Sequence, residues 1–237
     1  MRAPCDRDGF EHVHNLLRGF PSARVGDDDV CSAVAVAPDG KIVCAGTSAQ
    51  AGGSAMVAWR VNGDGSPDTS FHAGDGVAVV TASFPAGEAH AVHPLEQGRV
   101  LLTGVTSSGA RRQATAVLLT AGGTPDGSFG GAGVVAFDWG ESLPAGPPTS
   151  SRDAEGRLVV AAPATVPDKR IGVARLLPTG AFDEAWGPGG KQTYDADLGG
   201  NGERVFVAHD PEGRIVLATT VRGAAGPAKI VVLRLWS

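Results

Sequence analysis

The sequence predicts an all-β fold in which one antiparallel unit is repeated four times. A tight turn recurs at Gly40, Gly98, Gly156 and Gly213, so successive glycines lie 58, 58 and 57 positions apart. A second motif follows in the first three copies at nearly the same spacing, as Asp68-Thr69-Ser70-Phe71, Asp126-Gly127-Ser128-Phe129 and Asp183-Glu184-Ala185-Trp186. Because the two motifs recur in phase, each copy is expected to be one supersecondary unit that buries its core against its neighbours.

The composition favours short strands joined by tight turns. Glycine accounts for 35 and proline for 16 of the 237 residues, and only 5% are aromatic. Glycine and proline interrupt long helices and supply turn conformations, so an all-α fold is excluded. No linker interrupts the repeat, and we expect one domain over residues 1–237. Its repeats are expected at about 30–84, 85–140, 141–198 and 199–237, the last completed by residues 1–25.

Each copy shows an apolar period of two, which is typical of strands rather than helices. The predicted strands are 33–37, 41–47, 55–62 and 76–82; 90–93, 99–106, 113–120 and 133–137; 149–152, 157–162, 171–177 and 191–195; and 205–209, 214–221 and 229–235. Val, Ile, Leu and Ala dominate the second and third strands, as expected where both faces are covered. Four antiparallel strands per unit, repeated around an axis, predict a β-propeller.

The fourth copy has three predicted strands before Ser237, so its outer strand is missing. A sheet edge left unpaired would favour aggregation. The N-terminal segment offers a replacement, since residues 6–10 loosely match the Asp-x-x-Phe motif and residues 12–19 can form the following strand. We therefore expect a four-bladed propeller closed by pairing the N-terminal strand with the C-terminal blade, with a five-bladed ring as the alternative.

The two repeated motifs are expected to be structural. Turns such as Asp39-Gly40 need a positive φ, which glycine adopts without a Cβ clash. Phe71, Phe129 and Trp186 occur once per copy and are expected to pack as wedges between neighbouring blades.

The first copy resembles a known family. The run from Val34 to Gly46, followed by Trp59-Arg60-Val61-Asn62 and by the motif ending at Phe71, is similar to the bacterial delta-60 repeat. The resemblance weakens from copy to copy, since Trp186 replaces Phe in the third and the fourth lacks the second motif. It implies a β-propeller-like fold and no assigned activity.

Charge and cysteine content limit the partners. The formal net charge is −5 and basic residues are scattered, so we expect no nucleic acid. No apolar run approaches the roughly 18 residues of a membrane span, so we expect no membrane partner. The odd set of Cys5, Cys31 and Cys44 lacks paired zinc spacing, so neither a disulfide framework nor a structural metal site is expected. The expected location is cytoplasmic, with a secreted mature form as the alternative. A monomer is expected, although no motif fixes the oligomeric state.

One end of the predicted channel carries the candidate site. The loops that enter the inner strands and the hairpins between second and third strands differ in every copy, and such loops commonly carry function. The inner strands also differ, since Val34 and Val36 of the first copy give way to polar groups in later copies. Buried His and Arg need a partner, water or an anionic ligand. The candidate catalytic residues are His90, His93, Arg152 and His209, and the candidate substrate-binding residues are Glu88, Trp139, Glu141, Arg204, Glu203 and Asp29.

These residue types suit proton transfer better than metal chemistry. A histidine that titrates near the working pH can move a proton while an arginine stabilises a developing oxyanion. Trp139 and Glu141 are expected to lie over the opening. His90 and His93 are expected on opposite faces of a strand with no carboxylate to complete a metal site, so no metal or cofactor is predicted.

Three functions remain open. The first is a binding module that holds a small polar or anionic molecule at the loop-rich channel mouth. The second is a cofactor-independent lyase, cyclase or isomerase that uses the channel His and Arg residues. The third is a structural interaction scaffold, which ring closure would make less useful because no edge would remain to extend.

Overall fold

The computed structural model describes residues 28–80, 84–109, 111–139, 143–144, 146–165, 170–195, 204–222 and 228–236. Over these residues the protein is built of β-strands, with two short 3₁₀ turns, η1 (Glu96–Gly98) and η2 (Pro188–Gly190). The predicted all-β class is therefore confirmed. No helix in the described part of the chain is long and apolar enough to cross a membrane.

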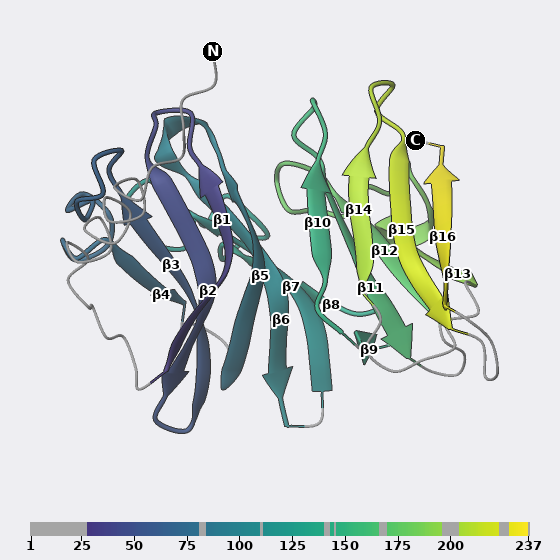
Figure 1. Ribbon diagram of the computed structural model, residues 1–237, viewed down its shortest axis with the longest axis horizontal. Helices are drawn as coiled ribbons and strands as arrows, with labels where there is room; N and C mark the ends of the chain where they lie inside the picture. Colours follow the sequence, from purple (N-terminus) through teal and green to yellow (C-terminus); the bar gives the residue numbers. More distant parts are fainter. Residues whose placement is uncertain are drawn as a thin grey trace, which may run out of the picture.

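The strands form four successive antiparallel units (Figure 1). Unit 1 contains β1 (Asp29–Val36), β2 (Ile42–Gln50), β3 (Gly53–Val61) and β4 (Val77–Val80). Unit 2 contains β5 (Ala86–Pro94), β6 (Val100–Ser108), β7 (Arg111–Leu119) and β8 (Val134–Phe137). Unit 3 contains β10 (Thr149–Arg152), β11 (Leu158–Thr165), β12 (Arg170–Leu176) and β13 (Lys191–Asp195), and the short β9 (Leu143–Pro144) pairs with β11. Unit 4 contains β14 (Val205–His209), β15 (Ile215–Arg222) and β16 (Ala228–Leu235).

Each unit is a meander in which consecutive strands pair. Units 1 and 2 belong to one eight-stranded sheet, but a single parallel pair, Ser54 with Ala86, joins them. Units 3 and 4 are separate sheets with the strand orders β10-β11-β12-β13 and β14-β15-β16. The strand order within each unit agrees with the predicted plan.

The repeated glycines set the turn between the first two strands of every unit. Gly40, Gly98, Gly156 and Gly213 have φ values of 82°, 71°, 80° and 79°. At three of these turns the glycine N–H donates to the carbonyl three residues earlier, as Gly40 does to Ala37 at 2.9 Å. The predicted structural role of this motif is confirmed, because a side chain at such a φ would be strained.

Three apolar cores lie at the junctions of successive units. The first joins units 1 and 2, the second units 2 and 3, and the third units 3 and 4. Phe71, Phe129 and Trp186 are buried in the first, second and third core, respectively. The predicted wedge role of these three aromatic residues is therefore confirmed.

The two end units lie far apart in the structure. Unit 1 stands at one end of the long axis and unit 4 at the other (Figure 1). Among the described residues, none of the three cores joins unit 4 to unit 1. The predicted pairing by residues 1–25 falls outside the described residues, so ring closure and the number of blades remain predictions.

One expectation about the cysteines is wrong. Cys31 on β1 and Cys44 on β2 form a disulfide, with their Cα atoms 6.0 Å apart. The cysteines are 13 positions apart in the chain, but the β1–β2 hairpin folds them onto neighbouring places in one antiparallel pair. Spacing along the chain does not show this proximity, because it depends on the strand register.

Candidate functional site

The first strands of units 2, 3 and 4 carry the predicted catalytic side chains. In unit 2 this strand, β5, has a bulge between Ala89 and Ala91, which places His90 outside the regular pairing with β6. A bulge breaks the alternation of side chains between the two faces of a strand. The side chains of His90 and His93 therefore do not follow simple alternation, on which their predicted placement on opposite faces depended.

His93 bridges units 2 and 3. Its Nε2 atom lies 2.7 Å from Ser150 Oγ on β10, and the same Ser150 Oγ lies 2.7 Å from Thr103 Oγ1 on β6. Burial lowers the pKa of His93 to about 4, and the nearby Arg152 charge acts in the same direction. A neutral imidazole can accept a hydrogen bond from the Ser150 hydroxyl. His93, Thr103 and Ser150 therefore form a hydrogen-bonded contact between units 2 and 3, which we call a seam.

A second seam of this kind joins units 3 and 4. Ser151 Oγ lies 2.9 Å from His209 Nδ1, and Thr149 Oγ1 donates to the Val205 carbonyl at 2.7 Å. Burial lowers the pKa of His209, although Asp153 opposes this effect. His93 and His209 therefore occupy different junctions instead of converging on one cavity.

His90 belongs to a separate charged group at the loop-rich end, which we call the rim cluster: Glu88, His90, Arg112 and Arg204. His90 Nε2 lies 3.4 Å from Glu88 Oε2, and Arg112 Nη2 lies 4.0 Å from the same carboxylate atom. Burial lowers the pKa of His90; Glu88 opposes this, and the charges of Arg112 and Arg204 lower it further. Among the described residues His90 Nε2 is a buried atom without a hydrogen-bond partner. The cluster thus combines groups from units 2 and 4.

Arg152 lies toward the opposite, glycine-turn end of unit 3. It lines a small cavity of about 90 Å³ with Arg99, Leu118 and Gly156. Burial lowers the pKa of Arg152, Asp153 opposes this, and the like charge of Arg99 adds to it. The predicted set of four catalytic residues is thus spread over the rim, two junctions and the turn end.

The remaining predicted binding residues have varied positions. Asp29 is exposed at the start of β1. Trp139 is buried in the core between units 2 and 3, where its ring centroid lies 5.5 Å from that of Phe137. It packs so closely over Gly172 that a Cβ added there would lie 2.4 Å from the indole. Glu141 and Glu203 fall outside the described residues.

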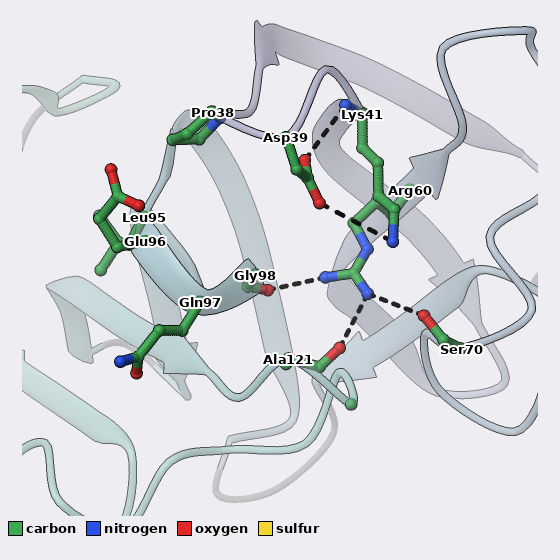
Figure 2. Close-up of a pocket in the computed structure, with 11 residues that line it drawn as sticks. Pro38, Asp39, Lys41, Arg60, Ser70, Leu95, Glu96, Gln97, Gly98 and Ala121 are labelled. Atoms are coloured by element: carbon green, nitrogen blue, oxygen red, sulfur yellow. Dashed lines mark hydrogen bonds and ion pairs between the residues drawn. The ribbon is translucent and has the colours of Figure 1, made fainter.

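Sequence reasoning missed a buried ion pair at the glycine-turn end. Arg60 Nε donates to Asp68 Oδ2 at 2.6 Å, and Lys41 Nζ lies 2.9 Å from the same oxygen. The guanidinium also donates to the carbonyls of Gly98 at 2.7 Å and Ala121 at 2.8 Å, both in unit 2 (Figure 2). Burial raises the pKa of Asp68, but hydrogen bonds from Ser70, Lys41 and Arg60 outweigh it and hold the pKa well below its ordinary value.

This arginine sits at the edge of a pocket of about 550 Å³ lined by Lys41, Glu96 and Gln97 among others. Its donors are already taken by Asp68, Ser70 and the two carbonyls, so it ties units 1 and 2 together and leaves little capacity for a ligand. The sequence signal was available, because Arg60, Arg175 and Arg234 occupy the same position in three copies. Arg175 likewise donates to Asp183 at 2.8 Å.

The described residues contain no group of three His, Cys, Asp or Glu side chains placed to hold a metal ion.

One comparison with known proteins, a short family match, supports the fold class. Residues 37–71 match the family model described as a domain of unknown function (DUF5122) beta-propeller. No curated protein sequence matches the chain. Among solved structures, a protein of unknown function from Dyadobacter fermentans is similar at 13% identity, with a TM-score of 0.46 over 85% of this chain and 59% of that one.

Two further solved structures are glycosidases by name. An endo-1,4-beta-xylanase from Bacteroides thetaiotaomicron is 12% identical, with a TM-score of 0.41 over 87% of this chain and 71% of that one. An alpha-L-arabinanase from Cellvibrio cellulosa, in complex with arabinohexaose, is 12% identical, with a TM-score of 0.42 over 85% of this chain and 72% of that one. No activity passes from them to this chain at such identities.

Proposed function

We propose that the protein is a binding module for a small anionic molecule, held at the loop-rich end by Arg112, Arg204 and His90. The observation that carries the proposal is the grouping of His90 and Arg112 around Glu88 Oε2, at 3.4 and 4.0 Å. The charge of Arg204, from unit 4, also acts on this half-buried histidine and lowers its pKa. His90 Nε2 lies 3.4 Å from Glu88 Oε2 but forms no well-aligned hydrogen bond in the described residues, so a ligand acceptor can compete with Glu88 for this atom.

The electrostatics of the rim cluster favour an anion. Arg112 and Arg204 bring two positive charges and Glu88 one negative charge, so the cluster has a net positive charge even with His90 neutral. Guanidinium groups bind carboxylates and phosphates through paired hydrogen bonds. A bound anion would also raise the pKa of His90, so binding is expected to take up a proton and to strengthen as the pH falls below neutrality.

Calorimetric titration tests the proposal, with inorganic phosphate and a small dicarboxylate as probes. Arg204→Gln should weaken binding at least about tenfold, as expected for the loss of one charged hydrogen bond. Arg111→Gln is the matched control, because this neighbouring arginine pairs with Asp138 at 2.9 Å and lies outside the rim cluster. Binding by Arg204→Gln that equals that of the unaltered protein would rule out the rim cluster as the site.

The enzyme alternative finds less support in the geometry. The predicted catalytic histidines are divided among two junctions and the rim, and two of them, His93 and His209, are hydrogen-bonded to serines of unit 3. A proton-transfer site needs its groups to converge on one reacting atom.

Two further parts of the proposal concern the setting of the site. Each unit is taken as one blade, with residues 1–25 supplying the missing fourth strand of unit 4. The Cys31–Cys44 disulfide supports the secreted alternative over the cytoplasmic one, since disulfides persist mainly in oxidising compartments. Three free thiols in the denatured protein isolated, with thiols trapped, from the cells that make it would contradict that location.

A further inference from the structure

Unit 4 ends in an exposed apolar surface, which we call the receiving face. Phe206 on β14 is 56% exposed, and Ile230 and Val232 on β16 are 79% and 61% exposed. Ala208, Val216 and Ala218 lie beside them in the strand register. Large apolar side chains gathered on one side of a sheet indicate a surface that another element covers.

The opposite end of the molecule carries a second such surface, the leading face of unit 1. Val34 and Val36 on β1 are 66% and 69% exposed. Ile42 pairs with Val36, and Cys44 pairs with Val34 and Trp59, so these residues continue the same face across the sheet.

The repeat shows what each face is built to contact. Val216 pairs with Arg234 in unit 4 just as Val43 pairs with Arg60 in unit 1, which fixes the equivalence of positions. The receiving-face residues therefore correspond to residues of unit 1 that are packed against unit 2: Ala33, Ala35, Val43, Ala45, Met56 and Ala58. The leading face corresponds in the same way to the side of unit 2 that packs against unit 1, formed by Val92, Val100, Leu102 and Val117. The two exposed faces are thus the two halves of one further junction.

Arg234 points to the same conclusion. Its side chain is 56% exposed, whereas the equivalent Arg60 and Arg175 are 4% and 6% exposed. Arg60 becomes buried because it donates to the carbonyls of Gly98 and Ala121 in the next unit. The positions in unit 1 equivalent to these two carbonyls are Gly40 and Gly63.

We propose that the receiving face binds the leading face of a second copy of this chain, so that copies associate head to tail. Within one copy the two faces lie at opposite ends of the long axis (Figure 1), and a second copy presents the matching face to each. Arg234 of one copy donates to the Gly40 and Gly63 carbonyls of the next.

Such an interface joins two different surfaces, and it closes only if the rotation between copies completes a ring. Two copies would contribute eight units, which lies within the four to eight blades known for propellers.

Complementary variants test the proposal in the full-length protein. Light scattering coupled to size exclusion should show that the unaltered protein forms dimers or longer assemblies. Val34→Asp and Ile230→Asp should each be monomeric, because each destroys one of the two faces. An equimolar mixture should form a one-to-one dimer, since one intact receiving face meets one intact leading face.

The outcomes separate head-to-tail association from closure within one chain. A monomeric unaltered protein, or variants that do not dimerise when mixed, would overturn the proposal. Arg234→Gln should weaken assembly at least about tenfold while leaving the circular dichroism spectrum unchanged. If this variant assembles as well as the unaltered protein, Arg234 does not stabilise the interface. Circular dichroism of both aspartate variants establishes that they fold before they are mixed.

Discussion

The junction between units 1 and 2 and the junction between units 2 and 3 use equivalent positions in opposite ways. At the first, the inner strands meet through apolar residues, including Ala35 and Val92, and the charged Arg60 lies at the turn end. At the second, His93 and Ser150 meet on the inner strands, and Leu118 takes the place of the arginine in the core. From the first junction to the second, the polar contact has moved from the turn end to the inner strands, and apolar residues occupy its former place.

The difference shows what the repeat requires of a junction. Burying a charge or an imidazole is costly unless it is paired, and each of these groups is paired where it occurs. Arg60 has Asp68 and two carbonyls, and His93 has Ser150. A position can therefore change from polar to apolar between copies, provided that its partners change with it.

The largest expected effect comes from the aromatic wedge of the first junction. Phe71→Ala should lower the free energy of unfolding by about 5 kcal/mol, because it opens a cavity and removes the ring that lies 4.2 Å from the Arg60 guanidinium. Phe129→Ala is the matched change at the second junction and should cost about 1 kcal/mol less, since Leu118 stands in place of that arginine. Urea unfolding measures both. Equal losses would show that the cation–aromatic contact adds no stability.

A smaller effect is expected from the charge of Asp68. Asp68→Asn keeps an oxygen for the turn but removes the carboxylate that pairs with the buried Arg60 and leaves Lys41 with Asp39 at 3.8 Å, so we expect a loss of about 4 kcal/mol. Asp126→Asn, the equivalent change opposite Leu118, should cost less than about 1 kcal/mol, because its nearest cation, Arg99, is 3.9 Å away and partly exposed. Urea unfolding midpoints decide between them, and similar losses for both variants would contradict a special role for the first pair.

The smallest effect is a pH dependence of the second junction. The pKa of His93 falls from 6.5 to about 4 on folding, so the unfolded chain binds more protons between these values. The free energy of unfolding therefore carries the full contribution of neutral His93 above pH 6.5. It decreases as the pH falls toward 4, by at most about 3 kcal/mol. His93→Gln should flatten the melting temperature over this range while keeping a partner for Ser150. An unchanged pH profile in the variant would show that His93 does not cause the dependence.

Much of the fold could be predicted from the sequence, because glycine turns at Gly40 and Gly98 mark the register of each unit directly. The aromatic wedges were also visible, since Phe71 and Phe129 recur in phase. The strand bounds differ mainly at their ends, where pairing between neighbours decides how far a strand extends.

The candidate site was harder to predict, because its geometry depends on contacts between units. Alternation along β5 could not reveal the bulge at His90 or show that His93 would meet Ser150 of the next unit. The Cys31–Cys44 disulfide depends on register in the same way. Arg60 was visible as a repeated residue, but only the structure shows that it reaches carbonyls of unit 2.

The single Ser54–Ala86 pair that links units 1 and 2 has a mechanical consequence. Because side chains rather than a continuous strand ladder hold these units together, tension applied to the two ends of the chain should detach one unit at a time. A repeat of 58 residues, fully extended, adds about 200 Å of contour length. A force-extension trace would then show a short series of steps, one for each copy of the repeat, and the step of unit 1 would lengthen when the Cys31–Cys44 disulfide is reduced.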